Sequence, residues 1–389
     1  MKSYASVSEF SRLGCVMLYN WKCPATMCLQ GKRHKDAAAE ALAFGRLSLE
    51  GEAIMNQLTV YVGAQRMKSR DSFVDALEAD TGSLLWRYAL RDTSSSFPVA
   101  STTGVYFSAG NGSVYALRTS DGSLLWQQQL NHQFPSPPVI VNGLIYVSTR
   151  DAVYALQATD GSLRWQHPLR DLVPIRPVAT SERVYARSIS DGSISTLQAN
   201  DGSLLWRTPS RGEMPISLVA TPDVVYLVEP DRGLSALHAS DGSPLWHQPT
   251  RYTGLGDPIM HDGILYLNAH DNLHARRASD GSLLWRFRAR RRGILSLAAM
   301  NGRLFVCGGR NTIVEVYALR TEDGSLVWRW RTSLQEGGVT DPVVAHETVY
   351  VGMGATDGLY ALHVSNGSIL WHALGDMGVT TAAVGERRL

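Results

Sequence analysis

The stretch that decides the fold is DGSLLW at residues 121–126, because the same six letters return at 201–206 and at 280–285. Five near copies bring the number to eight: TGSLLW (81–86), DGSLRW (160–165), DGSPLW (241–246), DGSLVW (323–328) and NGSILW (366–371). Successive copies lie 39–43 residues apart and end in the tryptophans Trp86, Trp126, Trp165, Trp206, Trp246, Trp285, Trp328 and Trp371. A fixed period in this range indicates a repeat architecture.

Each repeat extends upstream of its tryptophan. The residue ten positions earlier is alanine in seven of the eight copies, and an apolar–aromatic pair such as Val105-Tyr106 precedes it. The third copy, from about residue 136 to 167, reads as four short segments rich in β-branched and aromatic residues, separated by Asn-Gly, Asp-Gly and other turn residues. Glycine accepts a positive φ, so Asp-Gly joins two antiparallel strands tightly. Each repeat is therefore predicted to be a four-stranded antiparallel sheet.

A sheet of about 40 residues cannot bury both of its faces by itself. Radial stacking solves this problem, because each sheet covers its neighbour around a ring. The sequence predicts an all-β fold, an eight-bladed β-propeller. A linear solenoid is the alternative, and a four-strand unit ending in tryptophan fits a blade better.

Residues 1–50 differ from the rest of the chain. They lack the repeat, and they hold four of the five lysines and three of the four cysteines. We expect this segment to be a poorly ordered extension and residues 51–389 to form the propeller. The stretch 379–385 resembles the opening strand of a repeat, so we expect it to pair with blade one, displace 51–56 and close the ring.

The pattern A-L-x-A-x-D-G-S-L-L-W resembles the tryptophan-docking repeat of the pyrroloquinoline quinone (PQQ) propeller superfamily, over about residues 51–389. The resemblance implies that each tryptophan packs between blades, near the alanine and glycine of a neighbouring repeat. A buried tryptophan removes up to about 250 Å² of surface area from water, which favours a structural role for all eight. The superfamily includes quinoprotein dehydrogenases, and also non-enzymatic members such as the barrel-assembly lipoprotein and sensor propellers.

The sequence offers little for a quinoprotein active site. Dehydrogenases of the methanol-dehydrogenase type use PQQ, an adjacent Cys-Cys disulfide and a calcium ion, whereas this chain has no Cys-Cys pair. Its expected innermost strands carry only Asp257, Asp262 and Asp341 as acids, and calcium needs several converging oxygen ligands. The pairs His261-Asp262 and His270-Asp271 fall where turns are expected. We therefore expect no catalytic residue, no metal ligand and no cofactor, with a PQQ-dependent dehydrogenase as the rival interpretation.

One charge cluster departs from the repeat: RFRARRRG at 286–293 contains the candidate patch Arg286, Arg288, Arg290, Arg291 and Arg292. Alternating arginines on an outer strand can simply discourage edge-to-edge pairing. The functional interpretation is an anion site or an acidic-partner site, because arginine suits carboxylate and phosphate. Nucleic acid is not favoured, since the cluster is single and the chain carries a net charge of only +2.

These observations favour a monomeric, non-catalytic scaffold that presents one face to a protein or a small ligand. The face expected to bind is formed by the long connections between repeats: 88–96, 129–135, 167–175, 208–215, 249–256, 288–293 and 331–340. No signal peptide or transmembrane segment is predicted, although the resemblance favours an exported or periplasmic origin. A sensor propeller from a larger signalling protein is a further alternative.

Overall fold

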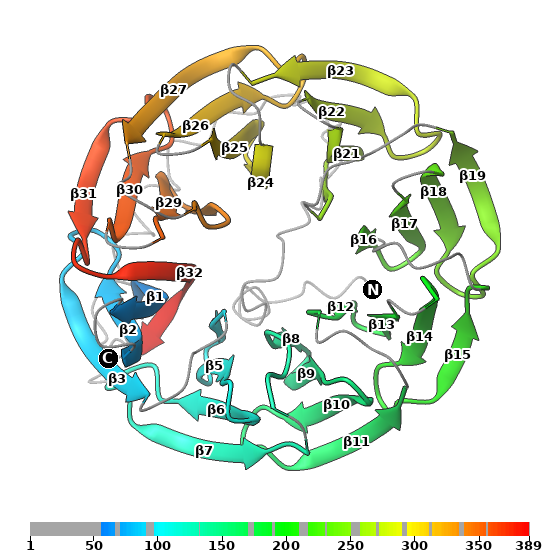
Figure 1. Cartoon of the computed structure of the whole chain (residues 1–389), viewed down its shortest axis with the longest axis horizontal. Coiled ribbons are helices and arrows are strands. Elements are labelled where there is room, and N and C mark those ends of the chain that lie inside the picture. Colours follow the sequence, from blue (N-terminus) through cyan, green and yellow to red (C-terminus); the bar gives the residue numbers. More distant parts are fainter. Residues whose placement is uncertain are drawn as a thin grey trace, which may run out of the picture.

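The repeats form eight four-stranded antiparallel sheets arranged around a ring, in a computed structural model of the whole chain (Figure 1). The structure describes residues 56–66, 71–90, 97–131, 133–169, 175–188, 191–209, 217–229, 232–249, 257–269, 272–289, 294–310, 313–333, 338–354 and 357–388. The all-β eight-bladed propeller predicted from the repeat is therefore confirmed. Among these residues, none forms a helix long and apolar enough to cross a bilayer.

Each blade runs from an innermost strand at the central channel to an outermost strand at the rim. In that order the strands of blades one to four are β32 (Gly378–Arg388), β1 (Asn56–Arg66), β2 (Asp71–Glu78), β3 (Leu84–Leu90); β4 (Val99–Ala100), β5 (Val105–Ser108), β6 (Ser113–Leu117), β7 (Leu124–Gln129); β8 (Val139–Val141), β9 (Leu144–Ser148), β10 (Ala152–Gln157), β11 (Leu163–Pro168); and β12 (Val178–Ala179), β13 (Arg183–Arg187), β14 (Ile194–Gln198), β15 (Leu204–Arg207).

The remaining four blades repeat the same order. Their strands are β16 (Ser217–Ala220), β17 (Val224–Glu229), β18 (Gly233–His238), β19 (Pro244–Gln248); β20 (Ile259–His261), β21 (Ile264–Ala269), β22 (Asn272–Arg277), β23 (Leu283–Arg288); β24 (Ile294–Met300), β25 (Arg303–Arg310), β26 (Ile313–Arg320), β27 (Leu326–Ser333); and β28 (Val343–Ala345), β29 (Thr348–Gly352), β30 (Leu359–His363), β31 (Ile369–Ala373).

Blade one combines both ends of the described chain. Its innermost strand β32 pairs antiparallel with β1 along ten residue pairs, from Asn56 opposite Arg388 to Gln65 opposite Gly378. The next contact around the ring also joins distant parts of the sequence, since Trp371 of blade eight donates from its indole Nε1 to the Ala79 carbonyl of blade one at 2.9 Å. These contacts close the ring. Residues 1–55 lie outside the described part of the chain.

The alanine ten residues before each tryptophan has a specific place in the sheet. Ala76 lies directly opposite Trp86 in the register of β2 and β3, and a bulge follows at Leu77. The same pairing and bulge recur in all eight blades, with Thr196 as the one exception to alanine. A bulge increases the local twist, so it turns the outer strand where the tryptophan leaves toward the next blade.

The glycine of each DGS turn leaves room for the tryptophan of the preceding blade. A Cβ added to Gly122 would lie 2.5 Å from Cε3 of Trp86, and Gly122 has a φ of +72°. The Trp86 indole Nε1 also donates to the Thr119 carbonyl at 2.9 Å, and the equivalent bonds of the other seven tryptophans measure 2.8–3.1 Å. Each tryptophan therefore contributes apolar burial and a hydrogen bond to one blade interface.

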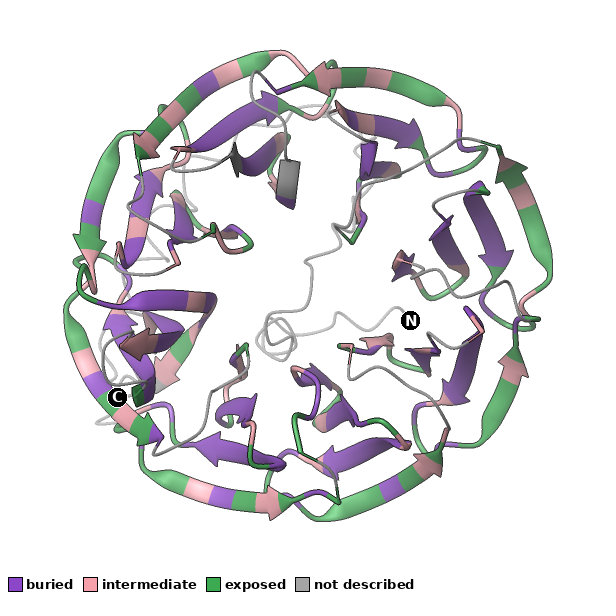
Figure 2. Ribbon diagram, in the orientation of Figure 1, coloured by how far each residue is buried: buried purple, intermediate pink, exposed green. Residues whose placement is uncertain are grey.

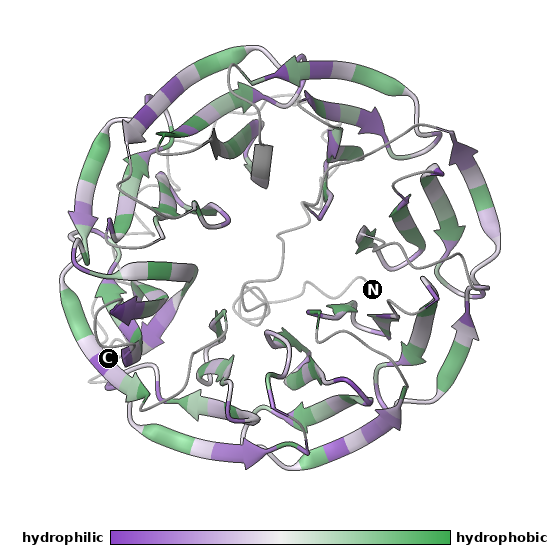
Figure 3. Cartoon of the chain, in the orientation of Figure 1, coloured by the Kyte–Doolittle hydropathy of each residue, from purple (hydrophilic) through white to green (hydrophobic). Residues whose placement is uncertain are grey.

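Residues on the outer strands alternate in burial and in hydropathy, as Figures 2 and 3 show. In β23, Trp285 and Phe287 are partly buried whereas Arg286 and Arg288 are exposed. Phe287 packs against Tyr317 of blade seven with ring centroids 5.2 Å apart, and Trp330 packs against Tyr360 of blade eight at 5.0 Å. The residue two positions after the tryptophan thus adds a second aromatic contact at these two interfaces.

Candidate functional site

The end of the central channel where the innermost strands begin collects charged side chains from several blades. Arg187 of β13 forms an ion pair with Asp257, just before β20, with 3.1 Å between Nη1 and Oδ1. This pair joins blades four and six across the start of blade five. Arg187 also donates to the Arg176 carbonyl at 3.4 Å, and only 8% of its side chain is exposed. The Arg187 charge is therefore engaged within the protein.

Asp341, which precedes β28, lies in the same region. The protein atoms around Asp341 partly remove its carboxyl group from water and raise its pKa, although the residue is exposed. A hydrogen bond from Ser296 and the charge of Arg176 oppose this shift, and the negative charge of Asp257 reinforces it. The negative charge of Asp257 is therefore felt at the Asp341 carboxyl group.

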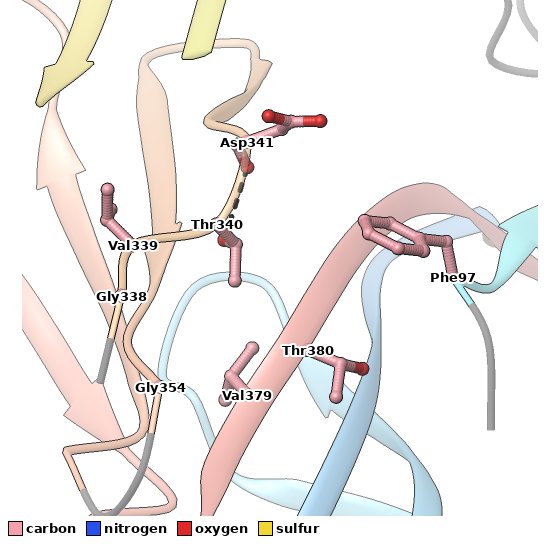
Figure 4. Close-up of a pocket in the computed structure, with 8 residues that line it drawn as sticks. All are labelled: Phe97, Gly338, Val339, Thr340, Asp341, Gly354, Val379 and Thr380. Carbon is pink, nitrogen blue, oxygen red and sulfur yellow. Dashed lines mark hydrogen bonds between the residues drawn. The ribbon is translucent and has the colours of Figure 1, made fainter. Parts of the chain in front are cut away.

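A hollow of about 300 Å³ lies beside Asp341, between blade eight and the closing strand β32 (Figure 4). It is lined by Phe97, Gly338, Val339, Thr340, Asp341, Gly354, Val379 and Thr380. Asp341 contributes the one ionisable side chain of this lining. The third acid expected on the innermost strands, Asp262, is not here: it occupies the turn after β20 with a φ of +49°, and its Oδ2 lies 3.5 Å from Nε2 of His261.

The side chains at this end of the channel do not match the calcium and PQQ site of the quinoprotein dehydrogenases. In the described ranges, no three His, Cys, Asp or Glu side chains gather so that they could hold a metal ion. Asp257 is paired with Arg187, and Asp341 is accompanied by a serine and an arginine. The described residues here do not fit a calcium-bound quinone.

Two members of the arginine patch predicted from sequence, Arg286 and Arg288, lie on β23, the outermost strand of blade six, and both are exposed. Arg290, Arg291 and Arg292 lie outside the described residues. The two nearby arginines on β22 are engaged: Arg276 is buried and donates to the Gly281 carbonyl at 2.7 Å, and Arg277 lies 3.4 Å from Asp280. Of the predicted patch, the structure therefore describes Arg286 and Arg288, and both are exposed on the outermost strand.

The connections between blades, which the sequence predicts to form the binding face, all contain residues outside the described ranges. That prediction stays a prediction. Residues His270 and Asp271 also fall outside these ranges.

Cys307 is fully buried on β25, and this burial raises the pKa of its thiol.

Sequence reasoning missed the carboxylates that lie close to three arginines of the outermost strands. The position directly after each blade tryptophan is Arg87 in blade one, Arg207 in blade four and Arg329 in blade seven. Each lies close to a carboxylate: Asp75, Asp191 and Glu315, respectively. Aligning the repeats on the tryptophan would have revealed the arginines, but not which acid reaches them.

Eight four-stranded blades joined by tryptophan docking define the class of PQQ-like β-propellers. The model of the family described as outer membrane protein assembly factor BamB matches residues 70–187, 143–251, 190–291 and 269–387. The chain belongs to this family of PQQ-like repeat propellers. No curated protein sequence matches the chain significantly.

Solved structures share the fold at low sequence identity. BamB from Moraxella catarrhalis is 19% identical with a TM-score of 0.60, over 73% of this chain and 88% of that one. The computationally designed protein Ika8 is 14% identical with a TM-score of 0.64, over 76% and 92%. The quinohemoprotein alcohol dehydrogenase ADHIIG from Pseudomonas putida HK5 is 13% identical with a TM-score of 0.59, over 77% and 69%. These likenesses establish the fold only.

Proposed function

We propose that this chain is a non-catalytic binding module that holds a protein partner along its rim. The observation that carries the proposal is a belt of exposed apolar side chains at the start of the outermost strands. Seven of them are 46–53% exposed: Leu84, Leu124, Leu163, Leu204, Leu283, Leu326 and Ile369. Exposed apolar side chains mark a protein interaction site where they gather into a patch, and Leu204 with Leu205, Leu283 with Leu284, and Ile369 with Leu370 are adjacent exposed pairs.

The outermost strands add a second property to this belt. Within the described ranges, each is hydrogen-bonded to one neighbouring strand, so its other edge leaves backbone N–H and C=O groups unpaired within the sheet. Such an edge can accept a strand from another protein, and proteins often protect it with charged side chains. The combination of apolar side chains and a free edge supports strand-to-edge binding at the rim.

The family supports the same proposal, because its description is that of an outer membrane protein assembly factor. By extension we place this chain in an exported or periplasmic compartment and treat it as a monomeric scaffold. The dehydrogenase alternative draws on structures that share only the fold with this chain.

Photo-crosslinking in the native host tests this function. A photoreactive amino acid replaces Leu204 or Leu326 in the belt, and replaces the exposed Glu347 in an inner turn as the matched control. We expect discrete protein adducts from the two belt positions and none from position 347. Absence of adducts from the belt, or alcohol oxidation by the purified protein that depends on added PQQ and calcium, would contradict the proposal.

A further inference from the structure

The residue after each blade tryptophan occupies an equivalent place in all eight blades. It lies on the outermost strand, directly opposite a residue of the third strand. The eight pairs are Asp75 and Arg87, Tyr115 and Gln127, Tyr154 and Gln166, Ser195 and Arg207, Ser235 and His247, His274 and Arg286, Tyr317 and Arg329, and Tyr360 and His372. The ring therefore provides eight versions of one cross-strand site, which can be compared with one another.

Arginine occupies this site in four blades, and in three of them a carboxylate neutralises it. In blade one, Arg87 binds Asp75 through two hydrogen bonds of 2.8 Å. In blade four, Arg207 Nη2 donates to Asp191 Oδ2 at 2.8 Å. In blade seven, Arg329 Nη1 lies 3.9 Å from Glu315 Oε1. An internal acid is thus the usual partner of this arginine.

Blade six is the exception. Arg286 lies opposite His274, and Arg288 lies opposite Asn272, so the third strand offers no acid at either place. In the part of the chain that the structure describes, no ion pair joins Arg286 or Arg288 to a carboxylate. Because strand residues alternate between faces, both arginines lie on the same side of the sheet, and both are exposed.

Two positive charges, those of Arg276 and Arg286, act on His274. Burial lowers the pKa of His274, and the charges of Arg276 and Arg286 lower it further. Cations placed directly opposite each other on a sheet repel, and the imidazole avoids this by staying neutral. An anion bound at Arg286 would neutralise its charge, as Asp75 neutralises the charge of Arg87 in blade one.

The edge of β23 determines the shape of the ligand. Among the strands that the structure describes, β23 pairs with β22 only, so an extended segment can add to its other edge. Side chains two residues apart on such a segment share one face, which matches the two-residue spacing of Arg286 and Arg288. Carboxylates suit the planar guanidinium fork of arginine.

We infer that blade six binds an extended acidic segment of a partner protein, with two carboxylates spaced two residues apart, on Arg286 and Arg288 at the edge of β23. This inference rests on the proposed function, since it names the chemistry of the partner that the rim would hold. In blades one, four and seven the arginine at this site is already neutralised, so blade six sets the orientation of that partner.

Fluorescence anisotropy tests the inference with a defined probe: a labelled seven-residue peptide in which two glutamates alternate with valine and threonine, at about 50 mM salt. A peptide with glutamine in place of both glutamates is its control. We expect the glutamate peptide to bind at least tenfold more tightly. We expect R286Q/R288Q to lose about tenfold or more in affinity, which corresponds to one or two lost charge-assisted hydrogen bonds.

A second variant removes binding without removing either arginine. H274D copies the blade-one arrangement and supplies an internal acid to Arg286, so the peptide should bind about tenfold less tightly while the thermal midpoint holds or rises. Equal binding of the glutamate and glutamine peptides, unchanged affinity in R286Q/R288Q, or tighter binding of a 20-base-pair DNA duplex would overturn the inference. If the peptide does not bind but photo-crosslinking at Leu204 and Leu326 still gives protein adducts, the inference fails and the proposed function stands. If the crosslinking gives no adducts either, both fail.

Discussion

Blades one and six place an arginine at the same point of the repeat and surround it differently. In blade one Arg87 holds a buried carboxylate, Asp75, and its guanidinium also lies over the Phe73 ring at 4.7 Å. In blade six Arg286 faces a histidine and is exposed. The first arginine stabilises the blade in which it lies, whereas the second is available to another molecule. A repeat protein can therefore acquire a binding site by losing one internal partner.

The largest effect should come from breaking what the two blades share. Gly122→Ala places a methyl group against Trp86 of blade one, and Gly324→Ala does the same to Trp285 of blade six, with 2.5 Å to Cε3 in both cases. The overlap and the positive φ together should lower the free energy of unfolding by about 2–4 kcal/mol in either variant. Urea denaturation measures this change.

Gly143→Ala is the matched control for these two variants. Gly143 also has a positive φ, of +74°, but a Cβ there would meet no atom within 4 Å. Gly143→Ala should lower the free energy of unfolding by about 1 kcal/mol, the strain of an alanine at a positive φ. If all three variants lose equal stability, tryptophan docking against glycine does not hold the blades together as described.

The next effect separates the two blades. Asp75→Ala leaves the Arg87 guanidinium, 29% exposed, without its carboxylate, and should cost about 2–3 kcal/mol, less than for a fully buried pair. Arg286→Ala removes an exposed side chain with no internal acid and should change stability by no more than about 0.5 kcal/mol. Thermal unfolding of both variants checks this. Equal losses would show that Arg286 has a structural partner after all.

The smallest effect concerns the pH dependence of blade six. The pKa of His274 is lowered in the folded protein, chiefly by burial and then by Arg276 and Arg286. As pH falls below about 6.5, the unfolded chain takes up this proton before the folded protein does, so folding stability decreases. His274→Gln should remove this part of the acid-side decrease, by less than the cost of Asp75→Ala. Unfolding curves at pH 7.5 and 5.5 make the comparison, and an identical pH dependence in both proteins would contradict it.

The fold could be predicted from the sequence because the same physical requirement recurs eight times. Each repeat places a small residue, alanine in all but one blade, opposite its tryptophan and glycine against the tryptophan of its neighbour, so Ala76, Trp86 and Gly122 follow a fixed spacing. The number of blades and the strand order within each blade follow from that spacing. The sequence did not show that Arg286 and Arg288 would be left without an internal carboxylate in the described part of the chain, or that Phe287 would pack against Tyr317.

The binding site on blade six could not be predicted, because the acid that neutralises the arginine has no fixed spacing. Asp75 lies twelve residues before its arginine, Asp191 sixteen and Glu315 fourteen. Three different strand or turn positions bring a carboxylate to one place in space. Only the side-chain ion pairs of Arg87, Arg207 and Arg329 show that blade six, where Arg286 has no such partner among the described residues, departs from the other three.

The measurement that tests the account most directly is the location of the bound acidic peptide on the ring. A glutamate peptide carrying a benzophenone at its centre is cross-linked to the wild-type protein by light, and the adduct is located by proteolysis and mass spectrometry. We expect the adduct between residues 272 and 288, on β22 and β23 of blade six. Adducts in blade one at β2 and β3, at the channel end around Asp341, or evenly over all eight outermost strands would contradict the claim that blade six is distinguished by its unpaired arginines.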